Sequence, residues 1–110
     1  MNLHFSLMLA QFNPIVGDLD KNYQMILEIH HRAATSGADL LTFPEMALTG
    51  YQAQDLILKL AFIAEVKTKI ELLACELVNG IPMLIGAPEY ENGMIYNAYY
   101  LIKEGTYKVV

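Results

Sequence analysis

Apolar residues recur along the chain in two patterns, short dense runs and a spacing of three or four residues. Dense runs bounded by turn-forming residues are typical of strands, and the three-to-four spacing is typical of helices that bury one face. The runs predict strands over 3–12, 38–43, 83–90, 94–102 and 106–110, and the spacing predicts helices over 21–36 and from residue 63 to about 77. The expected fold class is therefore α/β, in the order β-α-β-α-β-β-β.

The first predicted helix has recognisable signals at both ends. Asp20 can cap its N-terminus by accepting hydrogen bonds from backbone N–H groups, and Gly37 can end it in the left-handed conformation that glycine adopts readily. Because this helix joins two strands of one sheet, the connection should be right-handed and the strands parallel. Its predicted buried face consists of Tyr23, Ile26, Leu27, His30 and Ala34.

The second half of the chain predicts a helix followed by an antiparallel meander. Asp55 is expected to cap a short helical turn, and in the longer helix after it Lys69 is among the charged residues expected mostly to face water. Asn92-Gly93 supplies the two positive φ angles of a type I′ hairpin turn, and a second turn is expected at 103–105. The predicted buried positions of the longer helix are Ile63, Val66, Ile70, Leu73 and Leu77.

The predicted strands are apolar on both faces, although both helices can lie on the same face of the sheet. Either a second sheet or a second copy of the chain should therefore cover the other face. Hydrophobic residues make up 55% of the chain and the mean hydropathy is +0.31, which is apolar for one small domain. Because the last apolar run stops in mid-strand, we expect residues 1–110 to be part of a domain truncated at its C-terminal side. We also expect a homo-oligomer.

Charge and cysteine content exclude several classes of function. Seven Lys and Arg residues against 12 Asp and Glu residues give a net charge of −5, which argues against nucleic-acid binding, so Tyr96, Tyr99 and Tyr100 are expected to pack within the sheet. We expect neither membrane association nor a signal peptide, because there is no long apolar run, basic amphipathic helix or charged leader. The single cysteine fits a cytoplasmic protein, and the three histidines lack metal-ligand spacing, so no metal site is expected.

Glu45 is the residue whose position most strongly indicates chemistry. Pro44 cannot donate to a strand ladder, so the strand over 38–43 should stop there and Glu45 should follow its end. Ligands and catalytic groups gather at that end of open α/β sheets. A carboxylate between Pro44 and apolar residues would be partly desolvated, which would raise its pKa toward the range of a general base. The alternative is a glutamate at a helix start that backbone N–H groups satisfy.

Several motifs in the chain match one enzyme family. They are LAQFNP at 9–14, VGD at 16–18, Asn22, GADLL at 37–41, FPEMALTGY at 43–51, Asp55-Leu56, GAP at 86–88 and YNA at 96–98. With them, nearly all 110 residues resemble the N-terminal portion of the carbon-nitrogen hydrolase, or nitrilase, superfamily. Within it, the chain is most similar to the glutaminase domains of glutamine-dependent NAD+ synthetases. The resemblance implies a four-layer α-β-β-α sandwich, whose second sheet would cover the remaining face.

The resemblance also implies a Glu-Lys-Cys triad in which Glu45 is the glutamate. Glu45 would accept the thiol proton while the cysteine attacks the carboxamide carbon of glutamine, and the lysine would stabilise the oxyanion. Both partners would follow residue 110, so this chain alone is expected to be inactive. Tyr51 is expected either to contact glutamine or to pack. Cys75 is expected to be an ordinary buried or half-buried cysteine, and Lys103 and Lys108 are expected to be solvated.

By the same resemblance, the parent protein would release ammonia from glutamine and pass it to an ATP-activated intermediate of deamido-NAD+. ATP and Mg²⁺ would bind a separate synthetase domain, since this chain has no phosphate-binding glycine pattern, and no cofactor is expected within the chain itself. Two alternatives stay open. One is a stand-alone amidase, carbamoylase or nitrilase, and the other is a non-catalytic α/β module that dimerises through its apolar sheet face.

Overall fold

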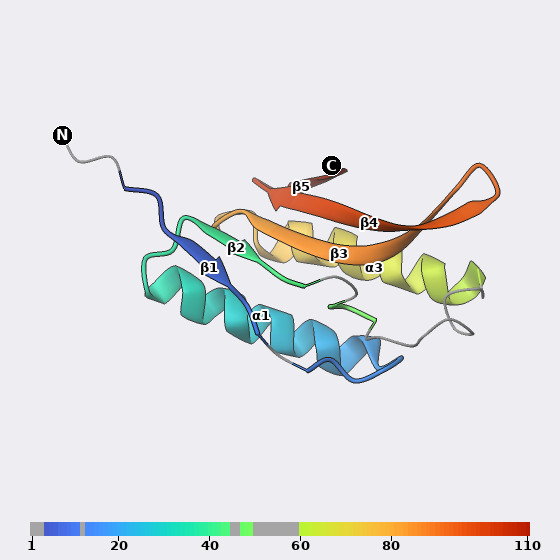
Figure 1. Cartoon of the computed structure of the whole chain (residues 1–110), viewed down its shortest axis with the longest axis horizontal. Helices are drawn as coiled ribbons and strands as arrows, with labels where there is room; N and C mark the ends of the chain where they lie inside the picture. Colours follow the sequence, from blue (N-terminus) through green and yellow to red (C-terminus); the bar gives the residue numbers. More distant parts are fainter. Residues whose placement is uncertain (1–3, 12, 45–46, 50–59) are drawn as a thin grey trace.

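The computed structural model describes residues 4–11, 13–44, 47–49 and 60–110. Its elements are β1 (Leu7–Leu9), α1 (Leu19–Thr35), β2 (Leu40–Thr42), α3 (Leu60–Glu76), β3 (Met83–Glu91), β4 (Met94–Lys103) and β5 (Thr106–Val109) (Figure 1). This order confirms the succession of strands and helices that the sequence predicts. The helical turn expected from Asp55 lies outside the described residues, as do Glu45 and Tyr51.

The described strands form one sheet in the order β1-β2-β3-β4-β5. β1 pairs with β2 and β2 with β3 in parallel, whereas β3, β4 and β5 pair antiparallel. The φ angles are +52° at Asn92 and +79° at Gly93, as a type I′ turn requires, and Glu104 and Gly105 repeat this at the second turn with +53° and +79°. The predicted parallel unit and the predicted meander are both confirmed.

The helix α1 begins two residues earlier than the sequence pattern predicts. Its N-cap is Asp18 and not Asp20, because the Asp18 carboxylate accepts a hydrogen bond from the backbone N–H of Lys21 at 3.1 Å. Gly17 has a φ of +75°, a left-handed conformation that turns the chain just before the cap. Asp20 consequently falls in the first helical turn, where a negative charge favours the helix N-terminus.

The buried face of α1 differs slightly from its predicted composition. Leu27 is only half-buried and Ala34 is exposed, whereas Ala33 is buried, because contact with the sheet decides between two neighbouring positions that a helical spacing allows equally. Gly37 follows the helix with a φ of +85°, as predicted. The buried residues of α1 are Leu19, Asn22, Tyr23, Ile26, His30 and Ala33.

Both helices cover the same face of the sheet (Figure 1). The strand side chains beneath them include Leu41, Met83 and Ile85, each fully buried. Among the residues that the structure describes, no helix has the length and apolar character needed to cross a membrane. The buried stripe of α3 consists of Ile63, Val66, Ile70, Leu73 and Ala74, with the predicted Leu77 only half-buried.

The opposite face of the sheet carries apolar side chains that the described residues do not cover. Successive residues of a strand point to opposite faces, so the residues next in sequence to the core residues Leu41 and Met83 point away from the helices. The sequence analysis assigns the cover of this face to a second sheet or a second copy of the chain, and that assignment stays a prediction. We call this surface the open face, and its members are Leu7, Leu9, Leu84, Tyr99 and Leu101; Leu7 is 53% and Leu9 67% exposed.

A polar cluster joins α1 to α3. The Tyr23 hydroxyl donates a hydrogen bond of 2.7 Å to the Glu76 carboxylate, and Lys69 Nζ lies 5.1 Å from the centre of the Tyr23 ring. Lys69 Nζ also contacts Asp20 Oδ1 at 2.6 Å. Lys69 is therefore half-buried between the helices, and the prediction that it mostly faces water is wrong because its contacts with Tyr23 and Asp20 hold its side chain along the interface.

Candidate functional site

The loops that follow β1 and β2 meet at one edge of the sheet. Because the two strands are parallel, their carboxyl ends lie at the same edge, where α/β proteins gather ligands. Glu45 belongs to the second of these loops but, with Met46, lies outside the described residues, and Tyr51 does as well. Their assignments as general base and glutamine contact stay predictions, and the described geometry concerns the residues on either side of Glu45.

On its N-terminal side, the chain is fixed where it leaves β2. The backbone N–H of Phe43 donates to the carbonyl of Leu84 in β3 at 2.9 Å, one residue past the end of β2. The Phe43 side chain is only 2% exposed and belongs to the hydrophobic core. The chain therefore enters position 45 from a buried and hydrogen-bonded part of the sheet.

On the C-terminal side, the turn over 47–49 is fully buried. Ala47, Leu48 and Thr49 each have 0% exposure. The Thr49 carbonyl accepts a hydrogen bond of 2.9 Å from the backbone N–H of Gly17, which lies in the loop after β1. The segment therefore leaves the Glu45 region at a second fixed point.

Asn22 connects the two loops. Its side chain is completely buried, and its Nδ2 group donates to the carbonyls of Ile15 at 2.7 Å and Leu48 at 2.8 Å. Its Oδ1 atom accepts from the backbone N–H of Ile15 at 2.7 Å. The sequence analysis used Asn22 only as a matching motif residue and missed this role. The available signal was an amide side chain four residues before Ile26, on the stripe of α1 that faces the sheet.

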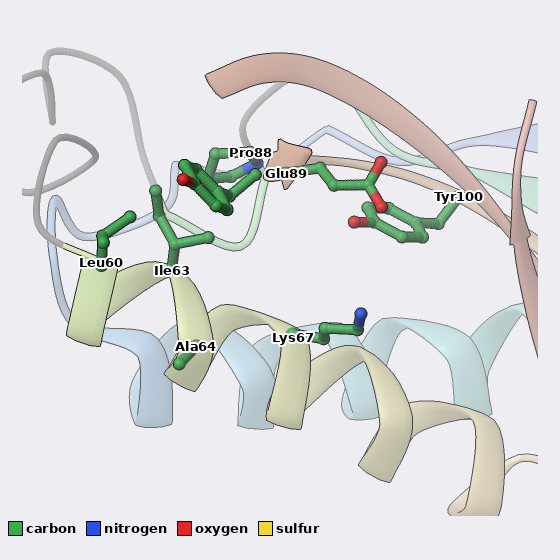
Figure 2. A pocket seen from close by; sticks show the side chains of 8 residues that line it. Leu60, Ile63, Ala64, Lys67, Pro88, Glu89 and Tyr100 are labelled. Atoms are coloured by element: carbon green, nitrogen blue, oxygen red, sulfur yellow. The ribbon is translucent and has the colours of Figure 1, made fainter. Parts of the chain in front are cut away.

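A cavity of about 260 Å³ lies between α3 and the β3–β4 hairpin (Figure 2). The Tyr100 hydroxyl and the Glu89 carboxylate lie next to each other on its sheet side, and Lys67 reaches toward them from α3. Burial raises the pKa of Tyr100 well above its usual range, and the negative charge of Glu89 raises it further. The described residues that line the cavity include no cysteine or serine, so they provide no thiol or hydroxymethyl nucleophile for amide hydrolysis.

The remaining candidate residues lie where a structural role would place them. Lys103 and Lys108 are exposed, which confirms their assignment as solvated charges. Cys75 is exposed on α3, so the expectation of a buried or half-buried cysteine is wrong; it lies on the solvent side of a helix that buries only one stripe. Tyr100 is 2% exposed and packs against Tyr107 with ring centres 6.0 Å apart, which confirms its expected packing within the sheet. Tyr96 and Tyr99 are 40% and 39% exposed, so the same prediction is not confirmed for them.

The histidines do not form a metal site within the described part of the chain. His30 is 4% exposed and its Nε2 atom lies 3.0 Å from the carbonyl of Ile81, which ties α1 to the segment before β3. His4 and His31 are exposed. Among the described residues there is no group of three or more His, Cys, Asp or Glu side chains that could hold a metal ion.

Comparison with known proteins gives a family match and similar structures. The sequence profile of the carbon-nitrogen hydrolase family matches residues 7–109. A glutamine-dependent NAD(+) synthetase from Rhodobacter capsulatus is 40% identical over 105 residues, which are 96% of this chain and 19% of that protein. The chain thus spans about a fifth of the length of the curated relatives it matches.

Two solved structures have the same fold. A glutamine-dependent NAD+ synthetase from Acinetobacter baumannii, solved in complex with ADP, is 34% identical with a TM-score of 0.85, and the match covers 93% of this chain and 19% of that one. An amidase from Nesterenkonia sp. gives a TM-score of 0.79 at 21% identity, over 97% of this chain and 41% of that one. The second comparison supports the mixed α/β fold alone.

Proposed function

The chain belongs to the carbon-nitrogen hydrolase family, and from that premise we propose that it forms part of the glutaminase domain of a glutamine-dependent NAD+ synthetase. Residues 1–110 would be the N-terminal portion of that domain, with the rest of the domain after them. The observation that carries this proposal is the 40% identity to a protein of that name over 96% of the chain, combined with a coverage of only 19% of the relative.

In this proposal Glu45 is the proton acceptor of a Glu-Lys-Cys triad. A cysteine outside this chain loses its thiol proton to Glu45 and attacks the carboxamide carbon of glutamine, while a lysine outside this chain stabilises the oxyanion. The C–N bond then breaks, the leaving nitrogen takes the proton from Glu45, and ammonia departs from a thioester. Water hydrolyses the thioester to glutamate and restores the thiol. A carboxylate suits this task because its environment can hold it ready to accept and return one proton.

The described residues around Glu45 support that role in two ways. The segment begins at the carboxyl end of β2, and both of its flanks are buried and hydrogen-bonded, at Phe43 and at the turn over 47–49. A catalytic group needs such support, because a displacement of about 1 Å can reduce a rate by about 10²-fold. We assign Tyr51, near the same segment, as a contact for the glutamine substrate.

The open face fits the same proposal. A second sheet packed on it would complete the four-layer sandwich and bury the side chains of Leu7 and Leu9, which this chain leaves exposed. An isolated chain with such a face should self-associate, and the expectation of a homo-oligomer rests on this surface alone. Because the open face is apolar and exposed, we place the second sheet of the domain against it.

The synthetase reaction would take place outside these residues. Ammonia would pass to deamido-NAD+ activated by ATP, and ATP with Mg²⁺ would bind a different domain of the parent protein. The described residues do not fit a nucleotide or metal site, since they include no metal-binding cluster and the sequence has no phosphate-binding glycine pattern. In this proposal the chain contributes to glutamine hydrolysis.

The two alternatives receive less support. A stand-alone amidase shares the fold, but at an identity of 21%, whereas the synthetase relatives reach 34% and 40%. A non-catalytic dimerisation module would not require the FPEMALTGY segment, which the family resemblance assigns to catalysis. Both alternatives would regain weight if the gene did not continue into an ATP-binding domain.

The test is substitution of Glu45 in the intact protein. Glu45→Gln should lower glutamine hydrolysis by about 10²- to 10⁴-fold, as expected for the loss of a proton acceptor. NAD+ formation from added ammonium should stay close to wild type, because ammonium bypasses the glutaminase domain. Glu104→Gln, in the exposed turn between β4 and β5, serves as the matched control and should change neither reaction. Normal glutamine hydrolysis by Glu45→Gln would refute the proposed role.

A further inference from the structure

We infer that Asn22 is a positioning residue for glutamine hydrolysis, because its buried amide fixes the turn that follows Glu45. This inference rests on the proposed function, since it concerns the placement of the proton acceptor. Asn22 lies on α1, 23 positions before Glu45 in the sequence, and it reaches the Glu45 loop only through the fold. Asn22 would act through the backbone and would not touch the substrate.

The amide of Asn22 uses its full set of donors and one acceptor on two loops. Oδ1 accepts from the Ile15 N–H, one Nδ2 hydrogen is donated to the Ile15 carbonyl, and the other is donated to the Leu48 carbonyl, all between 2.7 and 2.8 Å. An amide is the only neutral side chain with one such acceptor and two such donors on adjacent atoms. The loop after β1 is thereby joined to the loop after β2.

Burial of the Asn22 amide determines how much its removal would destabilise the turn over 47–49. Asn22 and Leu48 both have 0% exposure, so the hydrogen bond between them is shielded from bulk water, whereas the two hydrogen bonds to Ile15 are partly buried. A smaller apolar side chain at position 22 would leave two carbonyls and one N–H group without this partner. An aspartate would place a carboxylate against the two carbonyls, which repel it.

A second hydrogen bond holds the same turn over 47–49. The Gly17 N–H donates to the Thr49 carbonyl at 2.9 Å, one residue after the Leu48 carbonyl that Asn22 holds. Two successive carbonyls of the turn over 47–49 are thus bound, the Leu48 carbonyl by Asn22 of α1 and the Thr49 carbonyl by the loop after β1. The Phe43 N–H, bound to Leu84, holds the other flank of the Glu45 segment. Loss of the Asn22 amide would remove the hydrogen bond to the Leu48 carbonyl, while the Gly17–Thr49 hydrogen bond and the pairing of β2 remain.

The inference predicts a specific kinetic effect. In the intact protein, Asn22→Ala and Asn22→Asp should lower kcat for glutamine hydrolysis by about 10²-fold and change KM by less than about threefold, because the proton acceptor moves while the glutamine contacts remain. The rate at which iodoacetamide inactivates glutamine hydrolysis should fall in parallel, since a displaced base no longer deprotonates the thiol. NAD+ formation from added ammonium should stay within about twofold of wild type.

Ile70→Ala is the control for a general loss of stability. Ile70 is fully buried on α3 and forms part of the core, without a polar contact to either loop. At a matched decrease in Tm, it should leave kcat for glutamine hydrolysis and the iodoacetamide rate near wild type. If the Asn22 variants behave like Ile70→Ala, the positioning role is refuted. It is equally refuted if both Asn22 variants lose the ammonium-dependent reaction, because Asn22 would then be needed for folding of the whole protein.

The same experiment separates this inference from the proposed function. If Glu45→Gln abolishes glutamine hydrolysis and the Asn22 variants retain it, only the positioning role fails. If Glu45→Gln retains glutamine hydrolysis, the proposed function itself fails, whatever the Asn22 variants do.

Discussion

The hydrogen bond between Tyr23 and Glu76 is expected to stabilise the contact between α1 and α3, and Tyr23→Phe tests it cleanly. The substitution removes only the hydroxyl that donates to Glu76 at 2.7 Å. It keeps the ring, so the contact with Lys69, 5.1 Å from the ring centre, is retained. Any loss of stability therefore reports the hydroxyl and not the packing of the aromatic ring.

The expected loss of stability in Tyr23→Phe follows from the environments of the Tyr23 hydroxyl and the Glu76 carboxylate. Hydrogen bonds to charged partners contribute about 1.5 to 3 kcal/mol, and neutral ones about 1 kcal/mol. Tyr23 is 4% exposed but Glu76 is exposed to solvent, which weakens the interaction, so we expect a loss of about 1 kcal/mol. In a domain of 150 to 250 residues that corresponds to a decrease in Tm of about 2–4 °C.

The assay is chemical denaturation of the intact protein, with Tyr96→Phe as the control. Tyr96 also donates through its hydroxyl, but to the Glu91 carbonyl at 3.3 Å on an exposed surface, so its loss should change the free energy of unfolding by less than about 0.5 kcal/mol. A double-mutant cycle of Tyr23→Phe with Glu76→Ala should give a coupling energy near 1 kcal/mol. Equal effects of the two tyrosine substitutions, or a coupling energy of zero, would refute the reasoning.

Two further predictions concern alkaline pH and the open face. Burial raises the pKa of Tyr23 and Tyr100, and the neighbouring Glu76 and Glu89 raise it further. As the pH rises, the unfolded chain therefore releases these protons first, near pH 10, so the free energy of unfolding should be at its full value below that pH and fall above it. The double variant Tyr23→Phe with Tyr100→Phe should show a smaller fall in the free energy of unfolding, measured by denaturant titration at each pH. In the intact protein, Leu9→Asp should lower the free energy of unfolding by about 2 kcal/mol or more if a second sheet covers the open face. A change below about 0.5 kcal/mol in the same denaturation assay would show that the open face stays exposed.

The element order was predictable because each element has its own local signal. Dense apolar runs marked the strands, a three-to-four spacing marked α3, and Asn92-Gly93 fixed the type I′ turn through a conformation that few other pairs adopt. The N-cap of α1 was mispredicted because Asp18 and Asp20 are equally suitable by residue type. The turn at Gly17 decides between them, and that turn depends on the contact with Thr49.

The candidate site was predictable only in part. Glu45 and Tyr51 came from motifs, and they lie outside the described residues, so both stay predictions. The buried stripe of α1 indicated that the Asn22 amide needs partners, but the sequence could not identify them, because Ile15 and Leu48 belong to two loops that only the sheet brings together. For the same reason the half-buried position of Lys69 could not be read from a helical spacing, which describes one helix and not its neighbour.

The mixed pairing of the sheet has a consequence for the order in which the protein folds. β3, β4 and β5 pair with their immediate neighbours in the chain through tight turns, whereas β1 and β2 are separated by the whole of α1, and β2 and β3 by the whole of α3. Chain closure over short distances is faster than over long ones, so the hairpins should form early and serve as the template on which β2 and then β1 assemble. The strands β1 and β2, and the loop after β2 to which Glu45 belongs, would then join the sheet last, although the ribosome synthesises them before β3, β4 and β5.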